Sequence, residues 1–176
     1  NQPVTITSPT DAASGSMTDK DETFAGAGFT LIYPANWQTI DMSDQSMCAN
    51  PEFECALALA HPSRDGSNLN LIYFELEEEM DVVTVSEQAW NAFAASTPDA
   101  DLESTEEIKV GDYPAVKRVF STPSTSTSAG EAYFIQIFVV DGNRAYQFTV
   151  WAPTHQARQE HQADMLAVVD SLTFTP

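Results

Sequence analysis

The chain has 176 residues, of which 43% are hydrophobic and 10% aromatic, which suits one globular domain with a real core and excludes wholesale disorder. It carries 26 acidic residues against seven basic ones, a net charge of -19, so it repels phosphate backbones and anionic lipid surfaces. Nucleic acid is therefore excluded as a partner, and no apolar stretch approaches the roughly 18 residues that a membrane helix needs.

The first 23 residues are predicted to form a flexible polar tether, because Ser, Thr, Asp, Gly and Pro dominate them. Residues 24–176 are then one domain. Such a start is typical of mature secreted proteins and of lipoproteins. We therefore expect contact with a membrane only through an N-terminal lipid anchor that this chain does not contain.

The first half of the domain reads as short strands. Phe29–Tyr33 is a strand ended by Pro34, and a second extended piece surrounds Trp37–Ile40. Two further strands, in CALALAHP and in Asn68–Leu76, are separated by a segment whose Asp65-Gly66 pair suits a tight turn. The second of these strands is apolar on both faces, which predicts that both of its sides are covered.

Two cysteines, Cys48 and Cys55, lie close together in the sequence MCANPEFEC, in a loop after the Trp37–Ile40 piece. They form either a redox or metal pair or a small structural disulfide. A metal site would require tighter C-x-x-C spacing and two more ligands, so the spacing favours the disulfide. A disulfide is typical of an oxidising compartment.

A helix is predicted next, with Thr84 and Glu87 as its capping box and Pro98 as its end. Two strands joined at Gly111-Asp112 follow, and then a Ser/Thr-rich loop over 121–130.

The clearest hairpin in the chain comes after this loop, with strands over Glu131–Val140 and Arg144–Ala152 and a turn at 141–143. Thr154 is the expected N-cap of a last helix, and a short extended tail ends near Phe174. The order of elements predicts an α+β domain in which an antiparallel β-sheet is flanked by helices.

Three segments together resemble the PsbP-like and Mog1-like domains: the strand entry GFTLIYPANW, the hairpin segment VGDYPAVKRVF, and the helix end VVDSLTF. The likeness covers roughly Phe24 to Phe174. It implies an α/β/α sandwich and a group whose members mostly bind other proteins and do not catalyse reactions. The cysteine loop and polar tether favour its bacterial exported lipoproteins, of the LpqN and DcrB types. The scarcity of lysine argues against a photosystem role. The resemblance supplies no catalytic residues and no cofactor.

The remaining chemistry-bearing residues have ordinary interpretations. His155 and His161 are predicted to be solvated on the last helix, and His61 is a ligand or base only if an acid and a nucleophile converge on it. An acidic run offers weak candidates for a divalent cation but lacks the spacing and glycine of a calcium loop, which favours a solvated connection. That run comprises Glu75, Glu77, Glu78, Glu79 and Asp81.

Other carboxylates, at Glu52, Glu54, Glu103, Glu106 and Glu107, are predicted to be solvated too. Trp37, beside the turn after Pro34, is the candidate contact for a partner.

We therefore expect a non-enzymatic, exported interaction module that is periplasmic or extracellular. Its protein partner would have a basic surface. The alternative is a protein that binds small molecules or divalent cations with its acidic surface.

Overall fold

The computed structural model describes residues 21–26, 28–42, 48 and 52–175. Their larger sheet has seven antiparallel strands in the order β3-β4-β5-β9-β8-β7-β6. The strands are β3 (Gln38–Thr39), β4 (Glu54–Ala60), β5 (Asn68–Glu75), β6 (Asp101–Val110), β7 (Tyr113–Pro123), β8 (Glu131–Asp141) and β9 (Arg144–Ala152). The α+β class and the antiparallel sheet predicted from the sequence are confirmed.

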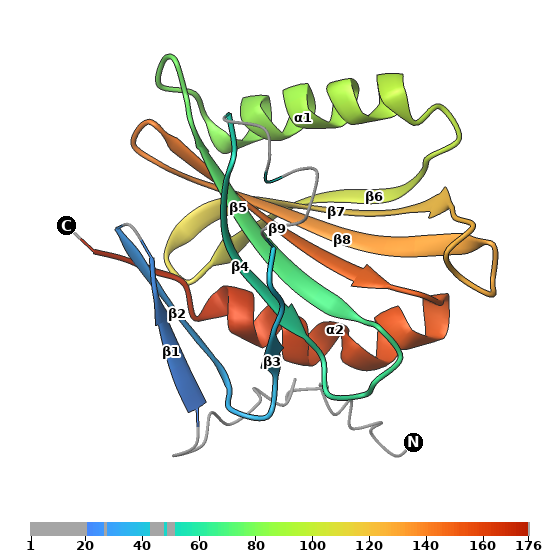
Figure 1. Cartoon of the computed structure of the whole chain (residues 1–176). Coiled ribbons are helices and arrows are strands. Elements are labelled where there is room, and N and C mark those ends of the chain that lie inside the picture. The colour runs from blue at the N-terminus through green and yellow to red at the C-terminus, as the bar shows by residue number, and fades with distance from the viewer. Residues whose placement is uncertain (1–20, 27, 43–47, 49–51, 176) are drawn as a thin grey trace, which may run out of the picture.

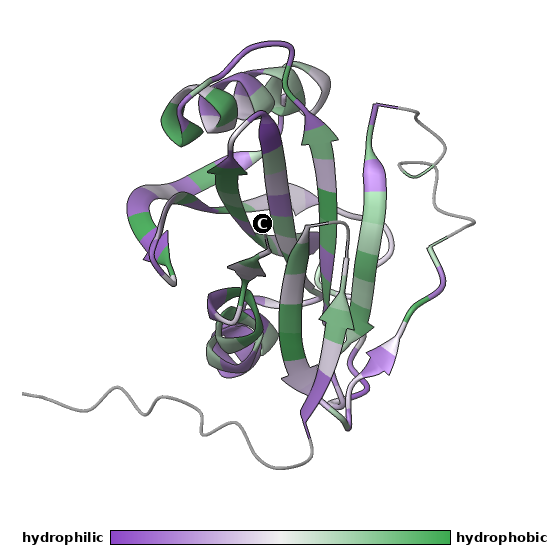
Figure 2. Cartoon of the chain, turned by 90° about the vertical axis from the view of Figure 1, so that its left-hand side faces the viewer, coloured by the Kyte–Doolittle hydropathy of each residue, from purple (hydrophilic) through white to green (hydrophobic). Residues whose placement is uncertain are grey.

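Helices cover both faces of this sheet, α1 (Val82–Ser96) on one side and α2 (His155–Asp170) on the other (Figure 1). On the α2 side lies a second sheet in the order β1-β2-β10, formed by β1 (Asp21–Ala25), β2 (Phe29–Pro34) and β10 (Thr173–Phe174). Both helices carry hydrophobic and hydrophilic residues around their axes, as helices at a surface do (Figure 2). No helix among the described residues has the length and apolar character to cross a bilayer.

The core has two parts, one on each face of the large sheet. The larger part lies under α2 and the small sheet, and the smaller part lies under α1. Strand β5 contributes Leu69 and Leu71 to the larger part, and Phe74 packs against the smaller part. The expectation that this strand is covered on both sides is therefore confirmed.

The strand connections differ from the sequence prediction at two places, one of which is the loop expected over 121–130, where β7 continues to Pro123. Gly111 and Gly142, both at positive φ, open the two-residue connections β6–β7 and β8–β9. The connection β4–β5 is longer than the expected tight turn, because Ala60 pairs with Asn68 and residues 61–67 lie between them. Gly66 still adopts a positive φ in this loop.

The start of α1 was predicted three residues too late. Asp81, not Thr84, is the N-cap: its Oδ1 accepts a hydrogen bond from the Thr84 backbone amide at 2.9 Å, and its Oδ2 accepts one from the Thr84 hydroxyl at 2.7 Å. The expected cap of α2 is confirmed, since Thr154 Oγ1 accepts from the Ala157 amide at 3.0 Å.

The expected boundary between tether and domain, after residue 23, falls inside β1. This strand begins at Asp21 and pairs with β2 from Asp21↔Pro34 to Ala25↔Thr30. The rest of the expected tether, residues 1–20, lies outside the described residues.

Two carboxylates expected to be solvated are exposed and also bind cations, which the sequence did not predict. Glu103 on β6 binds Arg158 of α2 through two hydrogen bonds of 2.7 Å each, and Arg158 is 5% exposed. The guanidinium hydrogen bonds hold the pKa of Glu103 below its usual value. Glu106 lies 2.9 Å from the ammonium of Lys117 on the neighbouring strand.

Candidate functional site

A groove of about 730 Å³ lies between α1 and the strands β5 and β9. The rings of Phe53 and Phe74 meet edge to face within it, with centroids 5.6 Å apart. Helix α1 contributes the small side chains of Ala89 and Ala92 and the ring of Phe93. We call this surface the α1 groove. Its full lining is Glu52, Phe53, Glu54, Tyr73, Phe74, Glu75, Leu76, Glu77, Val85, Gln88, Ala89, Ala92, Phe93, Gln136, Arg144 and Gln147.

Four exposed carboxylates surround these apolar walls, and they belong to Glu52, Glu54, Glu75 and Glu77. Arg144 is the cation among the described lining residues, and it is held by Glu75. Its Nε and Nη2 donate to Glu75 Oε1 at 2.9 and 2.6 Å, and its guanidinium lies 5.0 Å from the Tyr73 ring centroid.

The hydrogen bonds to Glu75 raise the pKa of the Arg144 guanidinium, so this pair stays ionised and is neutral overall. The rim therefore remains negative.

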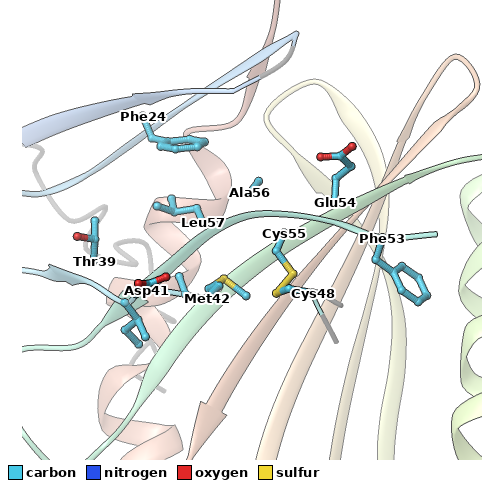
Figure 3. Close-up of a pocket in the computed structure, with 12 residues that line it drawn as sticks. Phe24, Thr39, Asp41, Met42, Cys48, Phe53, Glu54, Cys55, Ala56 and Leu57 are labelled. Atoms are coloured by element: carbon cyan, nitrogen blue, oxygen red, sulfur yellow. A yellow bond between two sulfur atoms is a disulfide. The ribbon is translucent and has the colours of Figure 1, made fainter. Parts of the chain in front are cut away.

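A second hollow of about 780 Å³ lies beside the first, between β1 and the outer part of β4 (Figure 3). Phe24 approaches it from β1, Met42 lines it from the segment after β3, and the Cys48–Cys55 disulfide lines it beside β4. Phe53 and Glu54 line both hollows, and Figure 3 shows Phe53 pointing away from the disulfide. The disulfide thus anchors the segment that forms one wall of the α1 groove.

The two cysteines form this disulfide with their Cα atoms 5.5 Å apart. Trp37, the expected partner contact, is only 6% exposed. Its indole packs edge to face on the His61 ring at 5.1 Å between centroids, so it is a core residue and no partner could reach its ring.

The histidines form an arrangement that the sequence did not predict. His61, after β4, stacks on His161 of α2 with ring centroids 4.1 Å apart. His61 Nε2 faces Asp164 Oδ2 at 3.7 Å, and His161 Nε2 faces Asp65 Oδ2 at 3.0 Å. His161 is therefore not a solvated helix residue, since its side chain is 14% exposed. His155 is exposed, as expected.

This histidine cluster holds two acids, but a nucleophile does not face it among the described residues. The Ser63 backbone amide donates to His61 Nδ1 at 3.3 Å, whereas the Ser63 hydroxyl donates to Asp65 Oδ1 at 2.8 Å. Burial and the neighbouring His161 lower the pKa of His61, although Asp164 and Asp65 oppose the effect. The cluster joins the β4–β5 loop to α2.

The acidic run does not gather into a metal site, and its first member, Glu75, binds Arg144. Glu77, Glu78 and Glu79 are exposed, and Asp81 is occupied as the cap of α1. Within the described part of the chain, no group of three or more His, Cys, Asp or Glu side chains is placed to share a metal. The sequence pattern that could have revealed the α1 groove is Glu52-Phe53-Glu54, in which an aromatic residue lies between two charges at the start of β4.

Comparisons with known proteins agree with this fold. A family model described as PsbP-like protein matches residues 5–174. No curated protein matches the chain significantly. The solution structure of cyanobacterial PsbP (CyanoP) from Synechocystis sp. PCC 6803 has a TM-score of 0.63 at 14% identity, and the match covers 95% of this chain and 99% of that one.

Two further structures are similar. LpqN of Mycobacterium tuberculosis, described as involved in cell envelope biogenesis, has a TM-score of 0.62 at 14% identity, over 89% of this chain and 91% of its own. The Ran-binding protein Mog1p of Saccharomyces cerevisiae has a TM-score of 0.56 at 10% identity, over 90% and 96%. The resemblance to PsbP-like and Mog1-like domains expected from the sequence is confirmed.

Proposed function

The chain belongs to the PsbP-like protein family, and from this premise we propose that it is a non-enzymatic module that binds another protein outside the cytoplasm. The observation that carries the proposal is the α1 groove, in which four carboxylates surround aromatic walls on a chain of net charge -19. Complementary charge gives protein association its specificity and speed. The partner therefore has a basic surface.

Protein binding has a precedent among the similar folds. Mog1p is described as a Ran-binding protein, although at 10% identity it shares only the fold with this chain. The disulfide supports export, because such bonds persist in oxidising compartments and are rare in the cytosol. The description of LpqN, involved in cell envelope biogenesis, is consistent with the same location.

Affinity capture tests the proposal. The full chain, carrying a tag at its C-terminus, is crosslinked in its native envelope and purified, and the products are identified by mass spectrometry. We expect one basic protein to be recovered reproducibly and to be lost when crosslinking is done at high salt, which screens charge. Repeated recovery of the chain alone would contradict the proposal.

The alternative, a cation-binding protein, predicts a different result. Calorimetric titration of the chain with calcium, manganese and zinc would then give a saturable heat at physiological salt. We expect no saturable site, because Asp81 already caps α1 and its neighbours in the acidic run are exposed.

A further inference from the structure

We propose that the α1 groove is the docking surface of this protein and that its occupant is a basic, amphipathic segment of the partner. This inference rests on the proposed function and adds a surface and a ligand chemistry to it. The groove has apolar walls for hydrophobic anchors, amide groups for a peptide backbone, and a carboxylate rim for lysine and arginine.

The apolar walls come from elements that are far apart in the sequence. Phe53 precedes β4, Phe74 lies on β5, and Phe93 lies on α1. Between them, Ala89 and Ala92 keep the surface of the helix low, so a partner side chain can reach down to Phe74. Aromatic and apolar walls that enclose a concave surface are what buried anchor residues of a partner require.

Three glutamines lie along the same groove: Gln88 on α1, Gln136 on β8 and Gln147 on β9. A glutamine amide both donates and accepts hydrogen bonds, so it can pair with either group of a peptide backbone without selecting a side chain. Gln147 already orients its amide by donating to Thr149 Oγ1 at 3.2 Å. This set favours a peptide segment over a purely apolar ligand.

The rim determines the charge of the occupant. Because Glu75 holds Arg144, the exposed carboxylates of Glu54 and Glu77 give the mouth of the groove a negative potential. Lysine or arginine flanking an apolar anchor would meet this rim. A second copy of this chain, with its own charge of -19, would be repelled, so the groove is not a self-association surface.

The probes that test this inference are three synthetic peptides of equal length. One combines lysine with leucine, one replaces leucine with serine, and one replaces lysine with glutamate. We expect the lysine and leucine peptide alone to bind the full chain in fluorescence anisotropy, and its affinity to fall as salt rises. Absence of binding up to about 1 mM peptide would overturn the inference.

Charge variants separate the groove from general attraction to an acidic protein. The triple variant Glu52→Gln, Glu54→Gln, Glu77→Gln should weaken binding about tenfold, since exposed charge pairs contribute little individually. The matched control, Asp99→Asn, Glu107→Gln, Asp112→Asn, removes the same charge from exposed positions outside the groove. The control should bind within about twofold of the wild type. Equal weakening by both would overturn the inference.

A steric pair gives an independent test that leaves the rim intact. Ala92→Trp fills the groove from the exposed surface of α1, and we expect it to reduce peptide affinity more than about tenfold. Asn91→Trp adds the same ring on a position of α1 that does not line the groove, and should leave binding unchanged. Thermal unfolding of both variants verifies the fold. Unchanged binding by Ala92→Trp would overturn the inference.

The two proposals can fail separately in the capture experiment. If the wild type and Ala92→Trp recover the same partner equally well, the proposed function stands and the α1 groove is not the docking surface. If neither recovers a partner, the proposed function itself fails.

Discussion

The two faces of the seven-stranded sheet are built differently. On the α2 face, α2 and the sheet β1-β2-β10 close over a large core that includes a chain of aromatic contacts. Phe29 meets Tyr146 at 5.5 Å between ring centroids, and Tyr146 meets Phe174 at 4.7 Å. On the α1 face, one helix packs on β7 and β8 over a smaller core and leaves the α1 groove beside it.

The two faces also differ in how a buried arginine is paired, since Arg158 on the α2 face binds the carboxylate of Glu103. Arg118 of β7 is 3% exposed, and its Nη1 donates to the Ser86 carbonyl of α1. Burial lowers the pKa of this guanidinium. A cation placed under a helix stabilises less than apolar packing of the same volume. The contrast indicates that the α2 face supplies most of the stability, whereas the α1 face keeps an open groove.

The largest expected effect tests this division directly. Phe148→Ala on β9 empties a fully buried position of the α2 face, and we expect it to lower the free energy of unfolding by about 3–5 kcal/mol. Phe93→Ala removes the same ring from a half-buried position of the α1 face. We expect a loss of about 1–2 kcal/mol there, because less apolar area leaves water.

Urea unfolding followed by circular dichroism measures both free energies. Equal losses for the two variants would show that the faces contribute alike, and the division proposed above would then be wrong.

An intermediate effect is expected from the disulfide. In the chain-entropy model a closed loop of about eight residues stabilises by roughly 2.5 kcal/mol, so the double variant Cys48→Ser, Cys55→Ser should lose about that much. The variant also frees the segment that carries Phe53, and therefore affects the α1 groove.

The double cysteine variant also compares the two faces of the sheet by their effect on peptide affinity. Its affinity for the lysine and leucine peptide should fall, whereas Phe148→Ala, measured where it remains folded, should bind as the wild type does. Unchanged peptide affinity in the disulfide variant would show that Phe53 is positioned without it.

The strands and helices with periodic apolar patterns could be predicted from the sequence. The side-chain pairs that join loops to distant elements could not. Strands β8 and β9 and the cap of α2 follow from local patterns, because alternating apolar residues, a Gly-containing turn and a Thr before a helix act within a few residues. The cap of α1 was missed because Asp81 and Thr84 are both good caps, and only the helix geometry decides between them.

The missed side-chain pairs depend on residues that the chain brings together from afar. Glu103 and Arg158 are 55 positions apart, and Asp65 and His161 are 96 apart. No local pattern reports such a pair. Trp37 was wrongly predicted to contact a partner for the same reason, because the ring that covers it belongs to His61, which follows β4.

The smallest expected effect comes from the histidine cluster, which belongs to the α2 face. Burial and His161 lower the pKa of His61 below its ordinary value of 6.5, so the unfolded state binds a proton more readily than the folded state does. The stability from neutral His61 is therefore present above pH 6.5 and is lost as pH falls through the lower folded pKa. The groups that face this ring are His161, Asp65 and Asp164.

Thermal unfolding from neutral to mildly acidic pH measures this loss. His61→Phe keeps a ring on Trp37 without a titrating group, so its unfolding temperature should depend less on pH, whereas His155→Gln, at an exposed position, should behave as the wild type.

Asp65 titrates at a lower pH than His61: its pKa is about 2, since hydrogen bonds from Ser67 and Ser63 outweigh burial. The stability from its charge is present above pH 3.8 and is lost as pH falls from there through about 2. Peptide binding in the α1 groove should not follow the His61 transition, because the cluster lies on the opposite face. A shared transition would mean that the two faces are coupled.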